Sequence, residues 1–449
     1  MKVKVLLFLF VFSLGLFSNR VSGQSSLVNL LNYALEHNRE IRKSNLQIKE
    51  ANYIRKEALG HGLPQVDGSG SYSKMMFEKF DIPSSLYLMI PPAYAPMIKE
   101  LGSIDKVYST SLGFQVTQLI YSQSYWIGLK TAQKTQELYT VLKTKNEEDV
   151  IDDVASTYYQ TGSLMLQLQT LDKSLKNLRE IYRIAELNYK SDFIKETDVS
   201  RLKVTITNLD VTRQTIKNGI DIQLNYLKAL AGMPDDSLLK IDTNALLTDF
   251  ERIKTNGDFK AENVPSYQVL LKQDEVYDQQ VKLSKAKYYP TLAAYGNFSF
   301  SSYNTTSDID KLKNMNTIGL NLSMPIFASG VNSAKVNQAI MKKAELQEDI
   351  MQTKDLLNIN YKNALSEYQT AHDLLSVQKE NLELSQKVYR QTLLQYQEGM
   401  ASMADLLNVN SDFLQADNSY NQQILKCKTS EIKMYKASGN LKPWINSKK

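Results

Sequence analysis

Most of the chain repeats apolar residues at helical spacing. The range 121–189 contains no proline and only two glycines, which predicts one helix of 69 residues, roughly 100 Å long at 1.5 Å per residue. Such a helix far exceeds the usual length in globular proteins. The same pattern predicts a second long helix over 332–396, and shorter helices over 26–59, 196–231, 266–287 and from about Met403 to Gly439.

Between these helices, short segments alternate apolar and polar residues with the period of two that is typical of strands. They are predicted at 66–72, 111–117, from Pro290 to Phe300, and from Ile318 to Met324. The alternation would place Phe298, Phe300, Leu320 and Leu322 on one face, and Asn297, Ser299, Asn321 and Ser323 on the other. One face could meet lipid and the other water, although a soluble sandwich with one wet face uses the same alternation.

The order of helices and strands occurs twice. Tyr182 and Tyr389, like Gly232 and Gly439, are separated by 207 residues, which indicates a tandem duplication. The first copy carries 20 extra residues between its two strands, where an insertion belongs in a loop. The expected organisation is a signal peptide at 1–23, a first repeat at 24–232, an inter-repeat segment at 233–263, a second repeat at 264–439 and a C-terminal tail at 440–449.

The helix after each predicted turn carries an apolar residue every seven positions, which indicates helices packed as a coiled coil. In the second repeat this series is Leu406, Phe413, Tyr420, Cys427 and Met434, and its counterparts are Val199, Ile206, Arg213, Ile220 and Leu227. Cys427, the only cysteine of the chain, is therefore expected in the core and cannot form an intramolecular disulfide.

The first residues are typical of a secretory signal peptide: two lysines, an apolar run from Val5 to Phe17, and small residues before Gln24. Its removal lowers the formal net charge from +5 to +2, because it takes away Lys2, Lys4 and Arg20 and no acid. This near balance argues against nucleic acid as a partner. No later stretch has the ~18 apolar residues of a spanning helix, so we expect any membrane crossing to use strands.

Four strands cannot close a barrel that encloses a channel, whereas three chains would supply twelve. The predicted fold class is therefore mainly α with a small β part. Tandem-duplicated hairpins of long helices would form a periplasmic α-helical barrel, and four strands per chain would contribute to a twelve-stranded trimeric outer-membrane β-barrel.

The mature chain resembles the TolC-like outer membrane efflux protein family. The resemblance rests on Ala34-Leu35 with Asn38, on Leu63-Pro64-Gln65-Val66 at a strand entry, on Tyr396-Gln397-Glu398-Gly399 with Asp405-Leu406 at the turn, and on the duplication. It implies a homotrimeric channel-tunnel in the lipid of the outer membrane with a long periplasmic extension. A periplasmic adaptor and an inner-membrane transporter are the implied partners, and drugs or other small molecules the implied cargo.

Other functions stay open from the sequence. Within the channel class these are an exit duct for type I protein secretion and metal efflux. In a different class, a periplasmic coiled-coil scaffold without a barrel would use the same helices. No nucleophile and base constellation argues for an enzyme, and no cofactor is expected. His37, His61 and His372 have no ligand spacing, so we expect no metal site.

The resemblance places a periplasmic gate, or lumen constriction, at Tyr396, Asp198 and Asp405. Each of the two aspartates also follows a turn, where an acid caps or complements a helix N-terminus. The chain departs from the family pattern at Ala401, where a linking arginine is frequent, and at Asn408, where a second lumen acid can lie. A gate centred on arginine is therefore not expected.

The two helix turns are the expected adaptor-docking surface, with Asp192, Phe193, Gly399, Met400 and Ser402 at their tips. Asp192 stands where the second repeat has Gly399, so the second turn is the better candidate for a moving part. The loop between the first two strands is rich in apolar residues from Phe77 to Tyr94. We expect it to fold over the channel mouth or against a neighbouring subunit.

Overall fold

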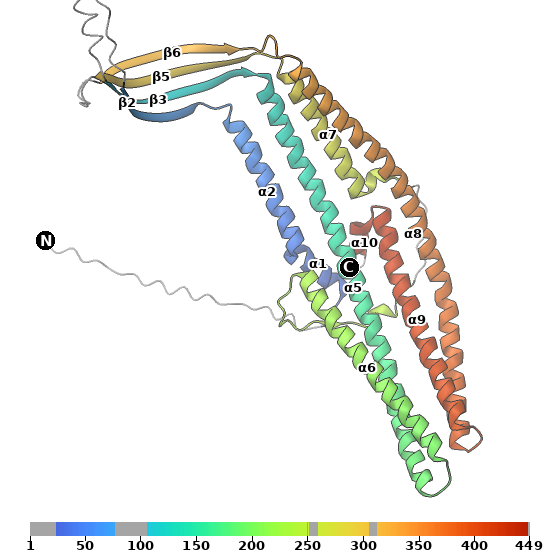
Figure 1. The fold of residues 1–449 in the computed structure, drawn as a ribbon. Coiled ribbons are helices and arrows are strands. Elements are labelled where there is room, and N and C mark those ends of the chain that lie inside the picture. The colour runs from blue at the N-terminus through green and yellow to red at the C-terminus, as the bar shows by residue number, and fades with distance from the viewer. Residues whose placement is uncertain (1–23, 77–105, 249, 251–258, 305–311, 448–449) are drawn as a thin grey trace, which may run out of the picture. The chain divides into compact units, whose positions relative to one another are not determined.

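A computed structural model describes residues 24–76, 106–248, 250, 259–304 and 312–447 (Figure 1). The apolar loop from Phe77 to Tyr94 lies outside these residues. The chain divides into two compact units, and each is described by itself. The helical unit comprises 1–45, 142–268 and 352–449, and the strand-bearing unit comprises 46–141 and 269–351.

The element order repeats, as the sequence predicts. The first half contains β1 (Gln24–Ser25), α1 (Leu27–His37), α2 (Arg39–Gly60), β2 (Gln65–Met76), β3 (Lys106–Ser122), α5 (Gln123–Lys190) and α6 (Glu196–Ala231). The inter-repeat segment contains β4 (Lys240–Ile241) and the short 3-10 helices η1 (Asn244–Leu246) and η2 (Ala261–Asn263). The second half contains α7 (Pro265–Ala286), β5 (Thr291–Asn304), β6 (Lys313–Ser323), α8 (Val331–Gln397), α9 (Met403–Ala437) and α10 (Leu441–Ser447).

The predicted long helices are confirmed. Helices α5 and α8 contain 68 and 67 residues, and α6 spans the predicted range 196–231. The equivalent helices of the two halves match closely, since α2 and α7 have 22 residues each and α6 and α9 have 36 and 35. Both α6 and α9 end before a glycine in left-handed backbone, Gly232 and Gly439, which stops a helix without a steric cost.

The prediction of one continuous helix over 26–59 is wrong, because the helix breaks at Asn38. The Asn38 side-chain oxygen accepts hydrogen bonds from the backbone N–H groups of Glu40 (2.7 Å) and Ile41 (3.2 Å), which caps α2. Its amide nitrogen donates to the carbonyl of Leu230 at 2.6 Å, near the end of α6. One side chain thus satisfies backbone groups of two helix ends.

The segment after Gly439, predicted as a tail, forms helix α10. Leu441, Trp444 and Ile445 are buried in the core of the helical unit. The Trp444 ring nitrogen donates to the Glu431 carboxylate at 2.9 Å, which satisfies both buried polar groups. The end of the described chain is therefore part of the packed structure.

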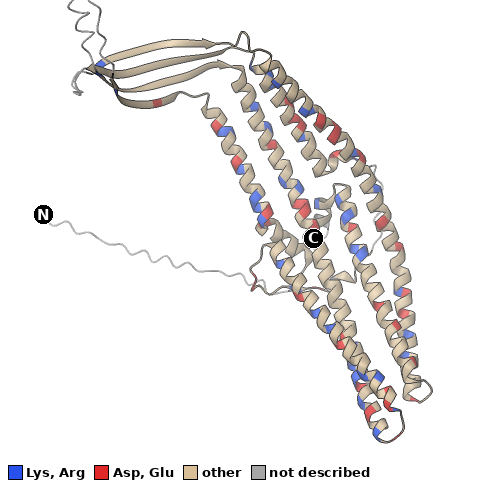
Figure 2. Ribbon diagram, in the orientation of Figure 1, with Lys and Arg blue, Asp and Glu red and all other residues tan. Residues whose placement is uncertain are grey.

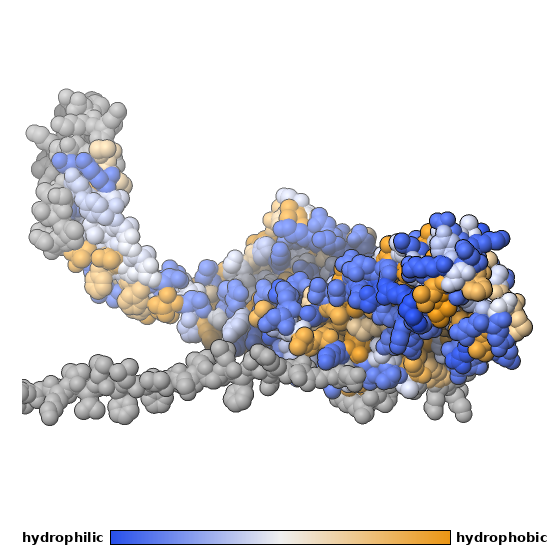
Figure 3. All heavy atoms as spheres, turned by 90° about the horizontal axis from the view of Figure 1, so that it is seen from below, coloured by the Kyte–Doolittle hydropathy of each residue, from blue (hydrophilic) through white to orange (hydrophobic). Residues whose placement is uncertain are grey.

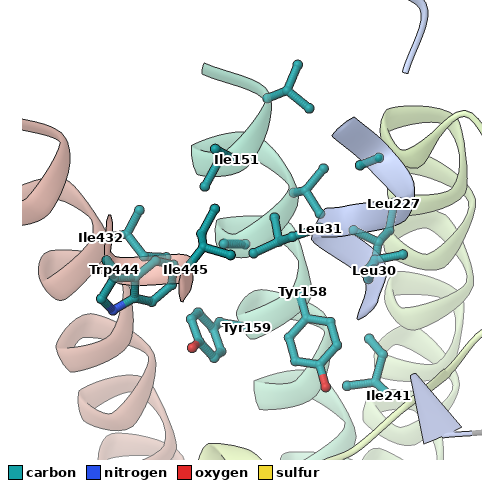
Figure 4. Close-up of a cluster of buried hydrophobic side chains, with 14 of the residues drawn as sticks. Leu30, Leu31, Ile151, Tyr158, Tyr159, Leu227, Ile241, Ile432, Trp444 and Ile445 are labelled. Carbon is teal, nitrogen blue, oxygen red and sulfur yellow. The ribbon is translucent and has the colours of Figure 1, made fainter. Parts of the chain in front are cut away.

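The main core of the helical unit gathers side chains from α1, α5, α6, α9 and α10 (Figure 4). Figure 4 shows Leu30 and Leu31 between Tyr158 and Leu227, with Trp444 and Ile445 on the side of Ile432. Burial of each Leu or Ile side chain in such a core contributes about 1.5–3 kcal/mol. Three residues of the heptad series predicted from sequence, Leu406, Cys427 and Met434, are buried. The expectation for Cys427 is confirmed.

The strand-bearing unit contains one antiparallel sheet in the order β2-β3-β5-β6. Phe114 pairs with Phe298 and Leu112 with Phe300, whereas Gln115 pairs with Asn297, so one face is apolar and the other polar. The strands are longer than predicted and carry few charges, as Figure 2 shows. Many apolar side chains of the sheet are exposed in the single chain, among them Leu320 and Leu322.

No helix within the described residues is apolar over a long enough stretch to cross a membrane.

Candidate functional site

The predicted functional residues lie at the two turns that close the helix hairpins α5–α6 and α8–α9, both in the helical unit (Figure 1). The turns have the same backbone pattern. Phe193 donates its N–H to the carbonyl of Asn188 at 2.9 Å, and Met400 donates to Gln395 at 2.8 Å. Asp192 and Gly399 donate to Tyr189 and Tyr396 in the same way, at 3.0 and 3.1 Å. Helices α5 and α8, the first helix of each hairpin, thus both end in a Schellman motif.

The residue at the left-handed position differs between the turns. Asp192 has φ 57° and Gly399 has φ 77°. Because a side chain in this region costs roughly 1–2 kcal/mol, the first turn carries backbone strain that glycine removes in the second. The sequence difference at this position changes the energy of the turn and leaves its geometry the same.

The helices that follow the turns begin differently. Ser402 caps α9, because its hydroxyl accepts from the N–H of Asp405 at 3.1 Å. The Asp405 carboxylate accepts in return from the backbone N–H of Ser402 at 3.0 Å and from its hydroxyl at 2.6 Å. Helix α6 has Lys195 at its N-cap position, and that residue makes no side-chain capping hydrogen bond. Of the two roles considered for Asp405, the structure shows the capping one.

The hydrogen bonds from Ser402 lower the pKa of Asp405 below its ordinary value, because they stabilise the charged carboxylate. Asp405 is exposed, and its hydrogen bonds lie within its own turn.

Tyr396 and Asp198 come from different hairpins and lie close together. Tyr396 is half-buried, and burial raises the pKa of its hydroxyl. The charge of Asp198 raises it further, so that carboxylate lies within electrostatic range of the tyrosine. The structure therefore brings together two of the three predicted gate residues.

An apolar cluster holds the two hairpin ends together. Its buried members come from α5, α6, α8 and α9 and are Leu178, Ile181, Ala185, Leu202, Tyr389, Met403 and Leu406. The rings of Tyr389 and Phe413 stack with their centroids 5.6 Å apart. Tyr396 packs against this cluster, which gives the turns a fixed support.

The apolar residue next to each left-handed position points away from this support. Phe193 is 82% exposed and Met400 is 69% exposed. Apolar side chains also interrupt the hydrophilic surface of the helices in Figure 3. A matched pair of exposed apolar side chains at the two turns is a surface that a partner could cover.

Above the turns, α5 and α9 meet through buried and partly buried polar groups that the sequence pattern did not predict. The Ser174 hydroxyl donates to Asn410 at 2.9 Å, and the Thr170 hydroxyl donates to Asp417 at 3.1 Å. Asn421 donates to the same Asp417 carboxylate at 2.9 Å. The signal in the sequence is that Asn410 and Asp417 are seven residues apart, four positions after Leu406 and Phe413 of the heptad series.

Charged pairs join α5 to α6 and were also missed. Arg179 donates from one nitrogen to both carboxylate oxygens of Asp210, at 2.6 and 2.8 Å, and Arg213 pairs with Asp172. Arg213 occupies a position of the apolar heptad series whose counterpart is Tyr420. A charged residue in that series was the sequence feature that could have predicted an ion pair here. No group of three or more potential metal ligands occurs within the described residues.

Comparison with known proteins finds similarity over both halves. The family model described as "Outer membrane efflux protein" matches residues 261–440. Outer membrane protein TolC of Salmonella enteritidis is 23% identical over 276 residues, which cover 56% of this chain and 55% of that protein. The chain thus matches about half the length of TolC. Cation efflux system protein CusC of Escherichia coli O157:H7 is 20% identical over 437 residues, covering 91% of this chain and 85% of CusC.

Solved structures show the same fold. The Campylobacter jejuni CmeC outer membrane channel superposes with a TM-score of 0.74 at 18% identity, covering 92% of this chain and 86% of CmeC. A CusC structure gives a TM-score of 0.72 at 16% identity, covering 92% of each chain.

Proposed function

We propose that this chain is a member of the TolC-like outer membrane efflux protein family and the outer-membrane channel of a tripartite export system, since the family model of outer membrane efflux proteins matches its second half. In this role it conducts drugs or other small molecules from an inner-membrane transporter and a periplasmic adaptor to the outside. The comparisons support an efflux role through the names of the relatives, and the fold is that of solved outer membrane channels.

The observation that carries the proposal is the sheet. Its order leaves β2 and β6 at the two edges, and its apolar face, with Leu320 and Leu322, is exposed in the single chain. Exposed edges and a wide apolar face are both unfavourable in water. Three copies would pair their edges in a closed barrel of twelve strands, with the apolar face toward lipid and the polar face toward the lumen.

A matched pair of substitutions on β6 tests this arrangement. Leu320→Arg places a charge on the apolar face, and Asn321→Arg places the same charge on the polar face. A charge facing lipid near the bilayer midplane costs about 2–4 kcal/mol. Leu320→Arg is therefore expected to lower the yield of a heat-modifiable trimer in outer-membrane detergent extracts, and Asn321→Arg to leave it unchanged.

The outcome separates the channel from its main alternative. A periplasmic coiled-coil scaffold without a barrel would be recovered as a soluble chain, and both arginine variants would behave alike. Planar-bilayer recordings on the purified trimer then measure whether it conducts.

The hairpin ends are the proposed gate. Tyr396 packs on the cluster that joins the hairpins, Asp198 lies within electrostatic range of its hydroxyl, and Asp405 presents a carboxylate at the second turn. Three copies around one axis would form an acidic constriction that favours cations. Opening the constriction would separate α5 from α9, and the buried Ser174–Asn410 and partly buried Thr170–Asp417 hydrogen bonds are the contacts that this motion would break.

The turns are also the proposed docking surface for the adaptor, at Asp192, Phe193, Gly399, Met400 and Ser402. Cysteines at Phe193 and Met400 test this, with exposed Leu384 as the control position. The native Cys427 does not compete, because it is buried and its pKa is raised to about 11. Cross-linking to an adaptor at the turns, and not at the control, is expected. Equal cross-linking at all three positions, or none, contradicts tip docking.

A further inference from the structure

A cavity of about 450 Å³ lies in the helical unit between α5, α8, α9 and the start of α7. Its walls combine apolar side chains, including Val264 and Leu357, with the amides of Asn360 and Asn363. A volume of this size accommodates a small organic molecule, and a mixed apolar and polar lining is typical of ligand pockets. The gate and docking proposals do not use this part of the chain.

The chemistry of the cavity centres on one acid, Glu148 of α5, which lines it. Only 5% of Glu148 is exposed. Within the described part of the chain, its carboxyl has no hydrogen-bond or ion-pair partner. A buried carboxyl without a partner is costly, because its desolvation is not offset by a hydrogen bond. A ligand that donates hydrogen bonds would remove this cost.

The neighbouring charges are already paired on α5 and α8. The Asp149 carboxylate pairs with the Nζ of Lys145 at 2.8 Å and with the Nζ of Lys436 at 3.0 Å. On α8, the lining residue Glu367 pairs with Lys426 at 3.2 Å.

The remaining charges around Glu148 come from α9 and α10. Lys433 lines the cavity from α9, and Lys436 pairs with Asp152 as well as with Asp149. Lys442 of α10 pairs with Glu147. Val264, just before α7, and the neutral Ser266, in its first turn, also line the cavity. Glu148 is therefore the acid of this cavity that no cation of the described chain neutralises directly.

We propose that this cavity binds a small organic molecule that combines a protonated amine with an apolar body. The amine would donate to the Glu148 carboxylate and to the side-chain carbonyls of Asn360 and Asn363. The apolar body would pack on Val264 and Leu357. The proposal concerns binding to the folded chain, so it stands or falls independently of the export function.

Binding is expected to depend on pH through Glu148. Burial raises the pKa of Glu148 from its ordinary value to about 7, although Lys442 and Lys436 oppose the shift. Between pH 6 and pH 8 the charged fraction of such a group increases about tenfold, while an alkyl amine stays protonated. Because the cation replaces a proton on the carboxylate, its affinity is expected to increase by up to about tenfold over this range.

The test uses the purified full-length chain in a non-ionic detergent, with 2-phenylethylamine as the probe and isothermal titration calorimetry as the readout. Three variants are compared with the unsubstituted chain. Glu148→Gln removes the charge and keeps the shape, Ala364→Phe fills the cavity, and Glu380→Gln changes an exposed acid of α8 as the control.

Saturable binding that strengthens from pH 6 to pH 8 is expected for the unsubstituted chain and for Glu380→Gln. Glu148→Gln is expected to weaken binding at pH 8 about tenfold and to remove the pH dependence, and Ala364→Phe to abolish binding. Absence of saturable binding overturns the proposal, and so does a Glu148→Gln chain that binds the probe as tightly as the unsubstituted chain does at pH 8. Far-UV circular dichroism of each variant shows that a loss of binding does not reflect unfolding.

Discussion

The end of helix α6 offers a sharp test of how the helical unit is packed. Gly232 has φ 73°, and a Cβ at this position would lie 2.4 Å from the carbonyl oxygen of His37 and 3.2 Å from the nitrogen of Asn38. Gly399 has nearly the same backbone, φ 77°, but a Cβ there would meet no atom within 4 Å. The two glycines therefore separate backbone strain from steric overlap.

The magnitudes follow from these two environments. Gly399→Ala carries only the cost of a left-handed side chain, about 1–2 kcal/mol. Gly232→Ala carries that cost and an overlap with backbone atoms, which typically adds about 1–3 kcal/mol. Because no side-chain rotation can relieve a clash with the His37 carbonyl, we expect a total of roughly 2–5 kcal/mol for Gly232→Ala.

Urea unfolding of the purified variants, followed by circular dichroism at 222 nm, measures the difference. Hydrogen exchange of the Glu40 and Ile41 amides gives a local readout, since the Asn38 side chain holds both. Gly439→Ala serves as a replicate in the second half, where the Cβ would lie 2.4 Å from the Asn263 carbonyl oxygen. The reasoning is refuted if Gly232→Ala destabilises the chain no more than Gly399→Ala does.

Four further outcomes are expected. Asp405→Ala removes a carboxylate from the proposed constriction and should relieve block by polyvalent cations in single-channel recordings. Asp192→Gly removes the strain of a left-handed side chain and should raise the free energy of unfolding by about 1 kcal/mol in urea titrations. Trp444→Ala removes a buried ring and a hydrogen bond to Glu431, and should lower that free energy by about 3–5 kcal/mol. The unsubstituted chain should lose stability between about pH 4.5 and pH 7, measured as urea midpoints against pH, and Glu148→Gln should abolish that loss. In that window the folded chain binds the extra proton, so the unsubstituted chain loses stability as pH rises, by roughly 3 kcal/mol in all.

Each of these outcomes has a result that would contradict it. Unchanged cation block places Asp405 outside the constriction and leaves it the capping role alone. A destabilised Asp192→Gly chain would mean that the aspartate side chain stabilises its turn. Wild-type stability of Trp444→Ala would show that α10 is dispensable, and a flat pH profile in the unsubstituted chain would show that Glu148 is solvated.

The helices, strands and turns were largely predictable from the sequence, because each depends on residues close to one another in the chain. The absence of proline over 121–189 and the glycines at 232, 399 and 439 mark where helices run and end. The alternation at Phe298, Phe300, Leu320 and Leu322 places one face of the sheet. Ser402 and Asp405 cap a helix through residues three positions apart, so this role was already among the alternatives.

Contacts between distant parts of the chain were decided only by the tertiary structure. The local sequence around Asn38 has a continuous helical pattern, but the helix breaks there because the Asn38 side chain donates to the carbonyl of Leu230, 192 residues away. Helix α10 forms because the core around Glu431 receives Trp444, and a short isolated segment has no such partner. The approach of Tyr396 to Asp198 and the cavity at Glu148 likewise depend on which helices become neighbours. The apolar periodicity of the sequence indicates which residues share a helix face, whereas only the packing of the helices determines which residues that face contacts.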